Sequence, residues 1–537
     1  MFGTGENEVG SPPGDGQRPR TIPDAVVLAA QRFGDDEALV DGPTRLTFAS
    51  LAAAVDRFAG ALVASGVNPG DRVAIWAPNG APWVVAGLGV YAAGAVLVPV
   101  NTRYKGEEAG HVLRTSRARL LLTVTDFLGH DLLGQLTGVS GLDDLEETVV
   151  LEGPVPARHP SGEEFVARGT RVEPSEIDRR RRALGGEDAA DIIFTSGTTG
   201  DPKGAVLGHE ASVRTYLAWS DLVGLRRGDR YLVVYPFFHT AGLKSGILAC
   251  VLRGATIVPQ AVFDVAAVMR RVAEERISML PGPPTVFQSI LNDPDFASFD
   301  LSSLRLSVTG AATVPVEVVR RMRDELRFET VVTGYGLTET TGTVSMCRHD
   351  DPPEIIATTV GRPLPGVEVR VVDANGIDAA RGEPGEILVR GFNVMQRYFE
   401  DPVATGQAVD GEGWLQTGDI GVVGEDGNLR ITDRKKDMYI VGGFNAYPAE
   451  IEGIMVRHPH VAQVAVVGVP DERLGEVGMA FVVARPGTTI DPDELVAWCG
   501  EHMANFKVPR RVRVVDGLPL NPTGKVMKFK LRQQLAG

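Results

Sequence analysis

Apolar residues between positions 48 and 125 are arranged in two alternating patterns. In residues 51–64 the apolar residues recur at helical spacing, whereas residues 72–76 and 120–124 are short and nearly continuous apolar runs. Helical spacing predicts a helix with one buried face, and short apolar runs predict buried strands. Strands that alternate with helices pair in parallel and are covered by helices. This part of the chain is therefore predicted to form an α/β layer.

The same alternation returns in the middle of the chain. Short apolar runs near 231–235, 255–258, 278–280, 304–308 and 329–333 predict strands, and helical stretches separate them. Two runs of this kind predict two sheets packed together. In open α/β sheets, ligands bind in the crevice beyond the carboxyl ends of the strands, so we expect the functional site there.

The pattern changes from about residue 359. Runs at 367–372, 386–389 and 429–432 are short and separated by Gly, Pro and Asp turns, which is typical of a small β subdomain. A charged tract at 433–437 follows. A compact α+β unit lies beyond it, with a helix after Pro448, strands at 464–469 and 480–483, and a helix from Pro492.

Together these patterns predict an α/β protein. Its large N-terminal domain would contain two packed, helix-covered sheets and a small β subdomain, followed by a small, mobile α+β C-terminal domain. Residues 1–20 are rich in Gly, Pro and charge and are expected to be a disordered tail. The N-terminal domain is assigned to 21–433, its β subdomain to about 359–433, and the C-terminal domain to 434–537.

Composition narrows the class of protein. The chain of 537 residues has a net charge of −15, which argues against a nucleic-acid partner, and its three cysteines are too few for a disulfide framework. Residues 82–100 are uncharged, but their alanines and glycines predict a buried helix and a strand at 95–98, not a membrane span. We expect a cytoplasmic protein. Its oligomeric state stays open, with a homodimer as one option.

A segment from Thr195 to Gly204, TSGTTGDPKG, follows the apolar run 192–194. Its glycines let backbone N–H groups turn toward an anion, and its hydroxyls and Lys203 supply further donors, which suits a polyphosphate. The segment is not a Walker A loop, because Pro202 stands where that motif needs glycine and no Ser or Thr follows the lysine. Taken alone, it is also compatible with a surface loop.

Four further segments follow this loop: YGLTE at 335–339, WLQTGD at 414–419, DRKKD at 433–437 and PTGK at 522–525. In this order, they resemble the adenylate-forming superfamily of acyl-CoA synthetases, luciferases and peptide-synthetase adenylation domains. The resemblance extends from about residue 20 to the C-terminal end. It implies that the chain joins a carboxylic acid to coenzyme A through an acyl-adenylate, using ATP and Mg²⁺.

The resemblance also implies which residues form the site. Those expected to bind the nucleotide or coenzyme A are Thr195, Ser196, Gly197, Thr198, Thr199, Gly200, Lys203, Gly310, Ala311, Ala312, Tyr335, Gly336, Thr338, Asp419, Arg434, Lys436, Gly442 and Gly443. Thr195 and Glu339 are expected at the magnesium ion. The expected catalytic residues are Lys525, Glu339 and His239.

The chemistry of these residue types suits the implied roles. Small residues at 310–312 would let a flat base lie against the backbone, beside the ring of Tyr335. The Asp419 carboxylate, expected at the start of a strand, suits the ribose hydroxyls, to which Arg434 would also donate. A hard Mg²⁺ ion prefers carboxylate oxygens such as those of Glu339. Taken alone, each of these residues would be read as an ordinary core or surface side chain.

The C-terminal domain is expected to act in two orientations. In one, Lys525 would bring a positive charge to the α-phosphate, where negative charge develops as the acid attacks. In the other, Gly442 and Gly443 would line the passage of the pantetheine arm. Lys436 is the expected hinge. Acetylation of Lys525 would erase its charge, so that residue is also a candidate regulatory switch.

Two polar residues near the predicted acyl side have alternative roles. His239 ends the segment YPFFH. A positioning or gating role is favoured over general base catalysis, because a carboxylate is already ionised at pH 7. Lys244 lies inside the apolar stretch 243–252. It is expected to extend its ammonium group to solvent, or else to contact a polar group of the acyl substrate or coenzyme A.

The segments at 237–239, 242–246, 281–284 and 442–448 resemble one actinobacterial branch of the superfamily. That branch includes the ligase for the fused-ring, hexahydroindane propanoate left by steroid ring degradation, which is therefore the expected substrate. A medium- or long-chain fatty acid and an aryl acid are the alternatives.

Rival classes are a stand-alone adenylation module, an ADP-forming ATPase or kinase, and a luciferase-like oxygenase. No carrier domain is expected, because the sequence ends twelve residues after Lys525. The nucleotide product separates the main classes, since ligation releases AMP and a kinase releases ADP.

Overall fold

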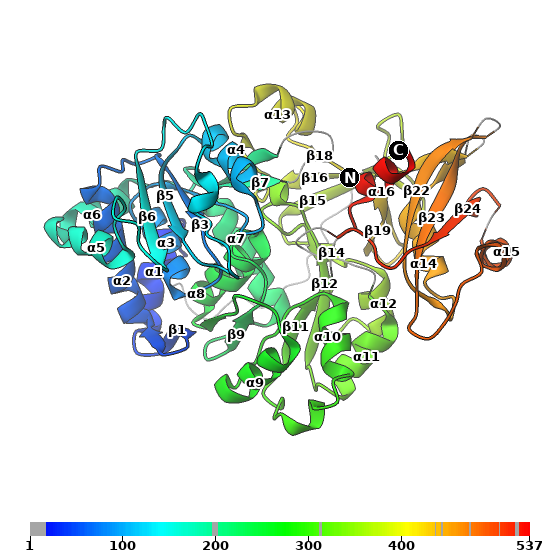
Figure 1. The fold of residues 1–537 in the computed structure, drawn as a ribbon, viewed down its shortest axis with the longest axis horizontal. Helices are drawn as coiled ribbons and strands as arrows, with labels where there is room; N and C mark the ends of the chain where they lie inside the picture. Colours follow the sequence, from blue (N-terminus) through cyan, green and yellow to red (C-terminus); the bar gives the residue numbers. More distant parts are fainter. Residues whose placement is uncertain are drawn as a thin grey trace.

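The computed structural model shows two large sheets with their helices and two smaller β-rich units toward the C-terminus (Figure 1). The structure describes residues 18–195, 202–310, 314–434, 437–441, 444–471, 474–503, 505–520 and 526–536. The predicted fold class is confirmed: the protein is a mixed α/β protein with a large N-terminal domain and a smaller C-terminal domain.

The first large sheet contains a run of parallel strands flanked by an antiparallel pair. Its strands, in spatial order, are β17 (Arg397–Tyr398), β8 (Lys203–Gly208), β7 (Ala189–Thr195), β4 (Val96–Pro99), β3 (Arg72–Trp76), β5 (Ala118–Val124) and β6 (Glu147–Glu152). The strands from β7 to β6 pair in parallel, and β8 runs antiparallel to β7. The strands predicted at 72–76 and 120–124 are β3 and β5.

The second large sheet is also largely parallel. It contains β2 (Thr44–Thr47), β1 (Glu37–Asp41), β10 (Thr256–Pro259), β9 (Arg230–Val233), β11 (Leu306–Thr309) and β12 (Thr330–Tyr335), and β13 (Ser345–Met346) and β14 (Arg362–Pro363) continue it beyond β12. Met279 bridges β9 and β11. The strand predicted at 278–280 is thus reduced to a bridge, because the prolines that follow have no N–H to donate to a ladder.

Two helices fill the space between the large sheets. α3 (Ala81–Ala92) packs against β3 and β4 of the first sheet and β1 of the second, and α7 (His209–Val223) packs against β8 and β11. α3 is apolar on nearly all sides, as a helix buried between layers must be. The prediction of a buried helix and strand for 82–100 is confirmed by α3 and β4. Among the described residues, we find no helix that is both long and apolar enough to cross a membrane.

Further helices surround these layers in the N-terminal part. They are α1 (Ile22–Phe33), α2 (Phe48–Ala64), α4 (Gly106–Ser116), α5 (Gly162–Ala167), α6 (Pro174–Ala183), α8 (Ala249–Arg253), α9 (Val265–Glu275), α10 (Pro284–Leu291), α11 (Val316–Asp324) and α12 (Pro353–Thr358). α1 begins with a capping box in which the Thr21 hydroxyl accepts a hydrogen bond from the Asp24 N–H and Asp24 caps the Thr21 N–H. Before it, Arg20 forms an ion pair with Glu210 at 3.1 Å.

A four-stranded antiparallel sheet follows the second large sheet. Its strands are β15 (Val367–Val372), β16 (Gly385–Gly391), β18 (Leu415–Val423) and β19 (Leu429–Arg434), and α13 (Pro402–Ala408) lies in the connection between β16 and β18. Three of these strands were predicted, and a strand was expected to begin only at Asp419, whereas β18 begins at Leu415. Its sequence, LQTGDIGVV, contains glycine and aspartate, which are depleted in strands, so its pairing depends on its neighbours.

The C-terminal sheet is built around a long antiparallel pair. Its strands are β21 (Phe444–Ala446), β20 (Tyr439–Val441), β23 (Gly475–Ala484), β22 (Val461–Asp471) and β24 (Arg511–Val514), accompanied by α14 (Pro448–Met455), α15 (Pro492–His502) and α16 (Lys528–Ala536). The strands predicted at 464–469 and 480–483 lie within β22 and β23. The helices predicted after Pro448 and from Pro492 are α14 and α15.

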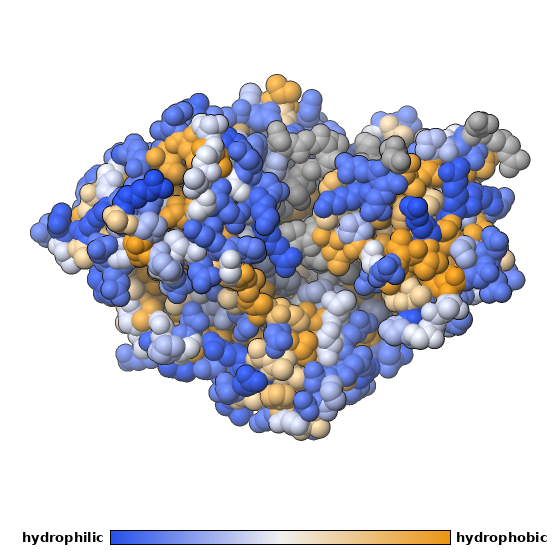
Figure 2. Space-filling view, viewed as in Figure 1, coloured by the Kyte–Doolittle hydropathy of each residue, from blue (hydrophilic) through white to orange (hydrophobic). Residues whose placement is uncertain are grey.

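The buried apolar residues form separate clusters. One cluster runs from Ile22 to Leu429, and two others lie between Tyr439 and Leu531. The cysteines at 250, 347 and 499 are buried and unpaired, as expected for a chain without a disulfide framework. Figure 2 shows a largely hydrophilic face with apolar side chains in separate patches, including one over the C-terminal sheet.

Candidate active site

The glycine-rich segment begins and ends at the tip of a β-hairpin. β7 and β8 are antiparallel, and Thr195 faces Lys203 as their last pair. The Thr195 hydroxyl lies 3.5 Å from the carbonyl oxygen of Lys203. This tip is the carboxyl end of the parallel strand β7, the edge at which α/β sheets bind ligands. The hairpin therefore presents two predicted phosphate-binding residues at the predicted edge.

A tyrosine that sequence reasoning did not select joins two predicted site residues. Tyr398 lies in β17, which pairs with β8, and its hydroxyl donates to Glu339 Oε1 at 2.8 Å. The Lys203 ammonium group lies 5.4 Å from the centre of the Tyr398 ring. Burial, and then the Glu339 charge, raise the pKa of Tyr398 well above its usual value, so this hydroxyl stays a donor. A lone tyrosine in a two-residue strand carries no sequence signal that could have identified it.

Glu339 is held in a tight turn after β12. The turn contains η5 (Thr338–Thr340), a single turn of 3₁₀ helix. Gly336 passes so close to Gly342 that an added Cβ would lie 2.3 Å from the Gly342 carbonyl oxygen. The Met395 N–H donates to the Glu339 carbonyl oxygen at 2.7 Å. These backbone contacts hold Glu339 and leave its carboxylate for contacts with other groups.

Two predicted nucleotide-binding residues that are far apart in the sequence meet in the structure. Tyr335, at the end of β12, donates its hydroxyl to Asp419 Oδ2 at 2.6 Å. Asp419 is only 3% exposed and lies in the middle of β18, so the prediction that it starts a strand is wrong. Opposite it in β19 is Arg434. The contact places an aromatic face beside a carboxylate, which suits a base and its ribose.

Gly310 directly follows β11, beside the same region. Its φ of +154° is a conformation that side chains other than glycine rarely adopt. Among the described residues that are not its chain neighbours, an added Cβ would meet only the Gly334 carbonyl oxygen within 4 Å, at 3.9 Å. The backbone is therefore open at this point, as the prediction of a base lying against it requires.

His239 precedes η3 (Ala241–Leu248), a buried π-helix. The Ala241 N–H donates to His239 Nδ1 at 3.2 Å. Because Nδ1 accepts this bond, the neutral ring carries its proton on Nε2. The ring is thus oriented by the start of the π-helix, which fits a positioning role.

The other predicted site residues lie outside the described part of the chain. They are Ser196, Gly197, Thr198, Thr199, Gly200, Ala311, Ala312, Lys436, Gly442, Gly443 and Lys525. Some of their neighbours are described. Leu520 and Val526 form an antiparallel bridge, so the two ends of the segment 521–525 are adjacent. Asp437 accepts a hydrogen bond from Arg532 of α16 at 3.0 Å.

The oxygen donors near the hairpin tip fit Mg²⁺. Glu339 supplies a carboxylate and Thr195 a hydroxyl, and Mg²⁺ is commonly held by one or two carboxylates together with substrate phosphates and water. Within the described ranges, there is no group of three or more His, Cys, Asp or Glu side chains that could hold a metal ion. This donor set therefore suits an ion that arrives with a phosphate ligand.

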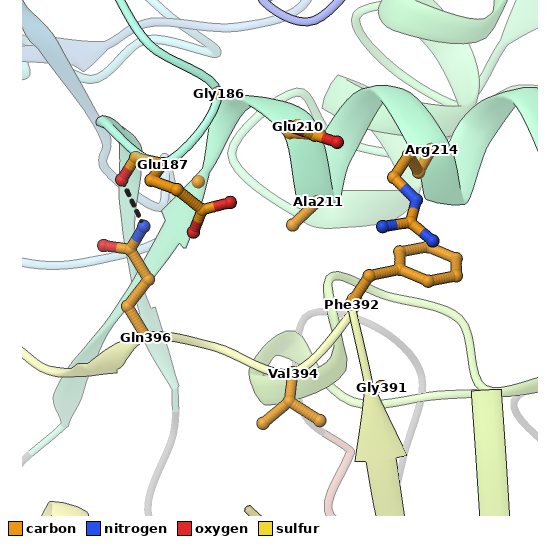
Figure 3. A pocket seen from close by; sticks show the side chains of 10 residues that line it. Gly186, Glu187, Glu210, Ala211, Arg214, Gly391, Phe392, Val394 and Gln396 are labelled. Atoms are coloured by element: carbon orange, nitrogen blue, oxygen red, sulfur yellow. Dashed lines mark hydrogen bonds between the residues drawn. The ribbon is translucent and has the colours of Figure 1, made fainter. Parts of the chain in front are cut away.

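A cavity of about 260 Å³ lies at the opposite end of the β7–β8 hairpin (Figure 3). The first turn of α7 and loop residues 391–396 contribute to its wall. The Arg214 guanidinium group stacks 4.0 Å from the centre of the Phe392 ring, and Gln396 donates to the Glu187 carbonyl oxygen at 2.6 Å. The length of the hairpin separates this cavity from Thr195, so it is distinct from the candidate active site.

The chain belongs to the AMP-binding enzyme family. The family model for AMP-binding enzymes matches residues 27–399, and the model for the AMP-binding enzyme C-terminal domain matches residues 450–525. Together they cover the two large sheets and β22, β23 and β24 of the C-terminal sheet.

Among individual proteins, the chain is 49% identical to a ligase of Rhodococcus jostii (strain RHA1), with 96% of this chain and 99% of that protein covered. That protein is named for 3-(7a-methyl-1,5-dioxo-octahydro-1H-inden-4-yl)propanoyl:CoA. A protein of the same name from Mycobacterium tuberculosis is 48% identical with the same coverage. Among solved structures, the anthranilate CoA ligase AuaEII in complex with anthranoyl-AMP has a TM-score of 0.86 at 28% identity, covering 97% of this chain and 99% of that one.

Proposed function

We propose that this protein is an AMP-forming carboxylate–CoA ligase whose preferred acid is a fused-ring propanoate from steroid ring degradation. The observation that carries the proposal is the 49% identity, over nearly the full length, to the ligase of Rhodococcus jostii. The pairing of Tyr335 with Asp419 and of Tyr398 with Glu339 supports it, because these contacts occur where a nucleotide and its metal ion would bind.

The reaction has two steps. A carboxylate oxygen of the acid first attacks the α-phosphorus of ATP, and pyrophosphate leaves with the electrons of the broken P–O bond. The thiolate sulfur of coenzyme A then attacks the acyl carbon, and AMP leaves. ATP is needed because a free carboxylate resists attack by a thiolate, whereas the mixed anhydride with AMP carries a good leaving group.

The residues of the N-terminal domain bind and orient the nucleotide. The Tyr335 ring stacks on adenine, and its hydroxyl orients the Asp419 carboxylate to accept hydrogen bonds from the ribose. Lys203 and the residues from Ser196 to Gly200 hold the phosphates. Thr195 and Glu339 would hold Mg²⁺, which when bound neutralises charge on the phosphates.

The C-terminal domain, assigned to 434–537, serves the two steps in turn. In the first orientation Lys525 lies at the α-phosphate, and in the second Gly442 and Gly443 line the path of the pantetheine arm. Lys436 is the hinge between them. The separation of the buried apolar clusters between Leu429 and Tyr439 supports this division.

Restricting the hinge tests this alternation. Lys436→Pro fixes the φ angle and is expected to slow thioester formation from preformed acyl-adenylate more than it slows adenylate formation. Both half-reactions are measured separately, by thioester formation and by carboxylate-dependent pyrophosphate exchange. Lys436→Ala, which keeps a free φ angle, serves as the control and should affect both steps little. Equal losses in both steps for the proline variant would count against domain alternation.

A panel of acids tests the reaction class and the substrate. The purified protein is offered the dioxo-octahydroindene propanoate, a medium-chain fatty acid and anthranilate, each with ATP, Mg²⁺ and coenzyme A. We expect AMP, pyrophosphate and a CoA thioester, with the fused-ring acid giving the highest kcat/KM by roughly tenfold or more, the discrimination available from a fitted pocket. Release of ADP would contradict the ligase. A higher kcat/KM for the fatty acid would favour the medium-chain alternative, to which 34% identical relatives point.

The partners required by this function are small molecules: the acid, ATP and coenzyme A. We propose a cytoplasmic location, which three buried, unpaired thiols also favour. The net charge of −15 supports the absence of a nucleic-acid partner.

A further inference from the structure

The layer between the two large sheets contains a completely buried ion pair. Lys244 of η3 donates to one carboxylate oxygen of Asp191 in β7, and both side chains are 0% exposed. Tyr91 of α3 donates its hydroxyl to the other oxygen. The Lys244 ammonium group also lies 5.5 Å from the centre of the Tyr91 ring. Three elements are thereby joined at one carboxylate.

The prediction that Lys244 reaches solvent is wrong. Residues 242–248 of η3 are all buried, so no route to the surface exists for a side chain of this length. Burial favours the uncharged form and lowers the pKa of Lys244, while the Asp191 carboxylate opposes this shift. The alternative, direct contact with substrate, also loses support because the ammonium group is already bonded to Asp191.

His209 of α7 borders the pair without adding charge. Its ring lies edge-on to Tyr91 with the ring centres 5.8 Å apart, and its Nδ1 accepts a hydrogen bond from the Ile22 N–H at 3.4 Å. Burial, with a smaller contribution from the Lys244 charge, lowers the pKa of His209 to about 3. At neutral pH, His209 therefore adds no charge to this cluster.

The ion pair is better explained by a role in fixing the position of η3 against β7 than by a contribution to the free energy of unfolding. Desolvation of two buried charges largely offsets their attraction, and well-packed apolar residues of similar volume often stabilise a core as much or more. An ion pair does supply hydrogen bonds of defined length between η3 and β7. β7 continues for four residues beyond Asp191 and ends at Thr195.

The start of η3 touches the turn that carries Glu339. Gly342 in this turn has a φ of +93°, and an added Cβ would lie 3.0 Å from the Cβ of Thr240, which directly precedes η3. Tyr216 of α7 donates to the Thr341 carbonyl oxygen in the same turn at 3.1 Å. The segment formed by Thr240 and η3 therefore contacts this turn at its start and β7 through Lys244.

We propose that the buried Lys244–Asp191 ion pair is a positioning device that sets the spacing between Thr195 and Glu339. It does so by holding η3 against β7 while the residue before η3 packs on the Glu339 turn. The inference rests on the proposed function, because it is there that these two residues share Mg²⁺ and the phosphates of ATP. Lys244 and Asp191 act through Thr195 and Glu339 and touch no reacting atom.

Two variants distinguish a role of the ion pair in positioning Thr195 and Glu339 from a role in neutralising a buried charge. Lys244→Met leaves the Asp191 carboxylate buried without its partner, so the melting temperature is expected to fall. The double variant Asp191→Asn with Lys244→Met removes both charges at similar volume and should recover most of the melting temperature. In both variants we expect adenylate formation to fall about tenfold, with a higher Mg²⁺ requirement, because misplaced binding groups slow a reaction that depends on alignment. Thioester formation from supplied acyl-adenylate should stay within about twofold of wild type, since that step does not need this spacing.

Arg305→Met is the matched control. Arg305 pairs with the largely buried Asp229 at 2.5 Å, at the start of β11 and away from Thr195 and Glu339. This variant should lower the melting temperature and leave adenylate formation unchanged at temperatures where it is folded. Recovery of both melting temperature and adenylate formation in the double variant would overturn the proposal, as would equal losses in both half-reactions.

Binding of ATP in the presence of Mg²⁺, without any acid, distinguishes this inference from the proposed function. Titration of wild type and variants is expected to show dissociation constants several-fold higher for both Lys244 variants than for wild type or Arg305→Met, because Thr195 and Glu339 no longer meet the ion together. Unchanged dissociation constants would overturn the positioning role, whatever the acid substrate is. A wild type that binds ATP but forms no adenylate from any acid would instead refute the proposed ligase.

Discussion

Lys525→Ala is expected to slow acyl-adenylate formation by roughly 10²-fold or more, because it removes a positive charge from the point where negative charge develops on the α-phosphate. Thioester formation from preformed acyl-adenylate should be largely spared, since Lys525 would have left the site by then. The two rates are measured by carboxylate-dependent pyrophosphate exchange and by thioester formation from supplied adenylate. Leu520 and Val526, on either side of the segment that contains Lys525, form an antiparallel bridge.

A lysine on the neighbouring helix provides the control for this experiment. Lys530 of α16 is exposed and carries the same charge. Lys530→Ala should leave pyrophosphate exchange close to the wild-type rate. If Lys525→Ala exchanges pyrophosphate as fast as wild type does, Lys525 has no part in adenylate formation. The proposed orientation that brings Lys525 to the α-phosphate would then be contradicted.

Glu339→Gln is expected to slow adenylate formation by roughly 10²-fold at a fixed Mg²⁺ concentration and to raise the Mg²⁺ concentration needed for half-maximal rate. The physical reason is the loss of the carboxylate charge that the ion prefers, since the amide keeps the size and one acceptor oxygen. Pyrophosphate exchange measured across a series of Mg²⁺ concentrations provides both quantities.

Tyr398→Phe separates the charge of Glu339 from its orientation. This variant removes the 2.8 Å hydrogen bond to Oε1 and leaves the carboxylate in place. We expect less than a tenfold loss, because one neutral hydrogen bond contributes about 1 kcal/mol. An unaltered Mg²⁺ dependence in Glu339→Gln would exclude Glu339 as a ligand. A larger loss of adenylate-formation rate in Tyr398→Phe than in Glu339→Gln would indicate that the tyrosine, and not the glutamate, contributes more to this step.

The large sheets were predictable because their strands are short, buried and separated by helices of clear period. β3 and the run Leu120 to Val124 are short apolar runs, whose length favours a buried strand over a helix. The start of β18 was predicted too late, at Asp419 and not at Leu415, because the glycine and aspartate in its sequence disfavour a strand and its formation depends on pairing with β16 and β19. Asp419 was consequently placed at a strand start, whereas the structure places it in the middle of β18.

The partners of the site residues were less predictable than the residues themselves. The segments that contain Thr195, Glu339, Tyr335 and Asp419 are recognisable along the chain, but nothing in them indicates that Tyr335 bonds Asp419. Tyr398 and Asp191 lack any motif, and their roles depend on β17 and β7 lying beside other elements. Lys244 was assigned to solvent because a lysine in an apolar helix usually extends to the surface, and that reasoning cannot foresee a buried carboxylate opposite it.

The amino-acid sequence by itself determined the α/β class, the order of the segments and the types of side chain offered to a nucleotide, because these follow from local periodicity and from chemistry carried within a few residues. Only the tertiary structure decided which of those side chains meet and which charges are buried. Contacts such as Tyr335–Asp419, Tyr398–Glu339 and Lys244–Asp191 join residues more than 50 positions apart. Such contacts arise when sheets and helices pack, and no local pattern records them.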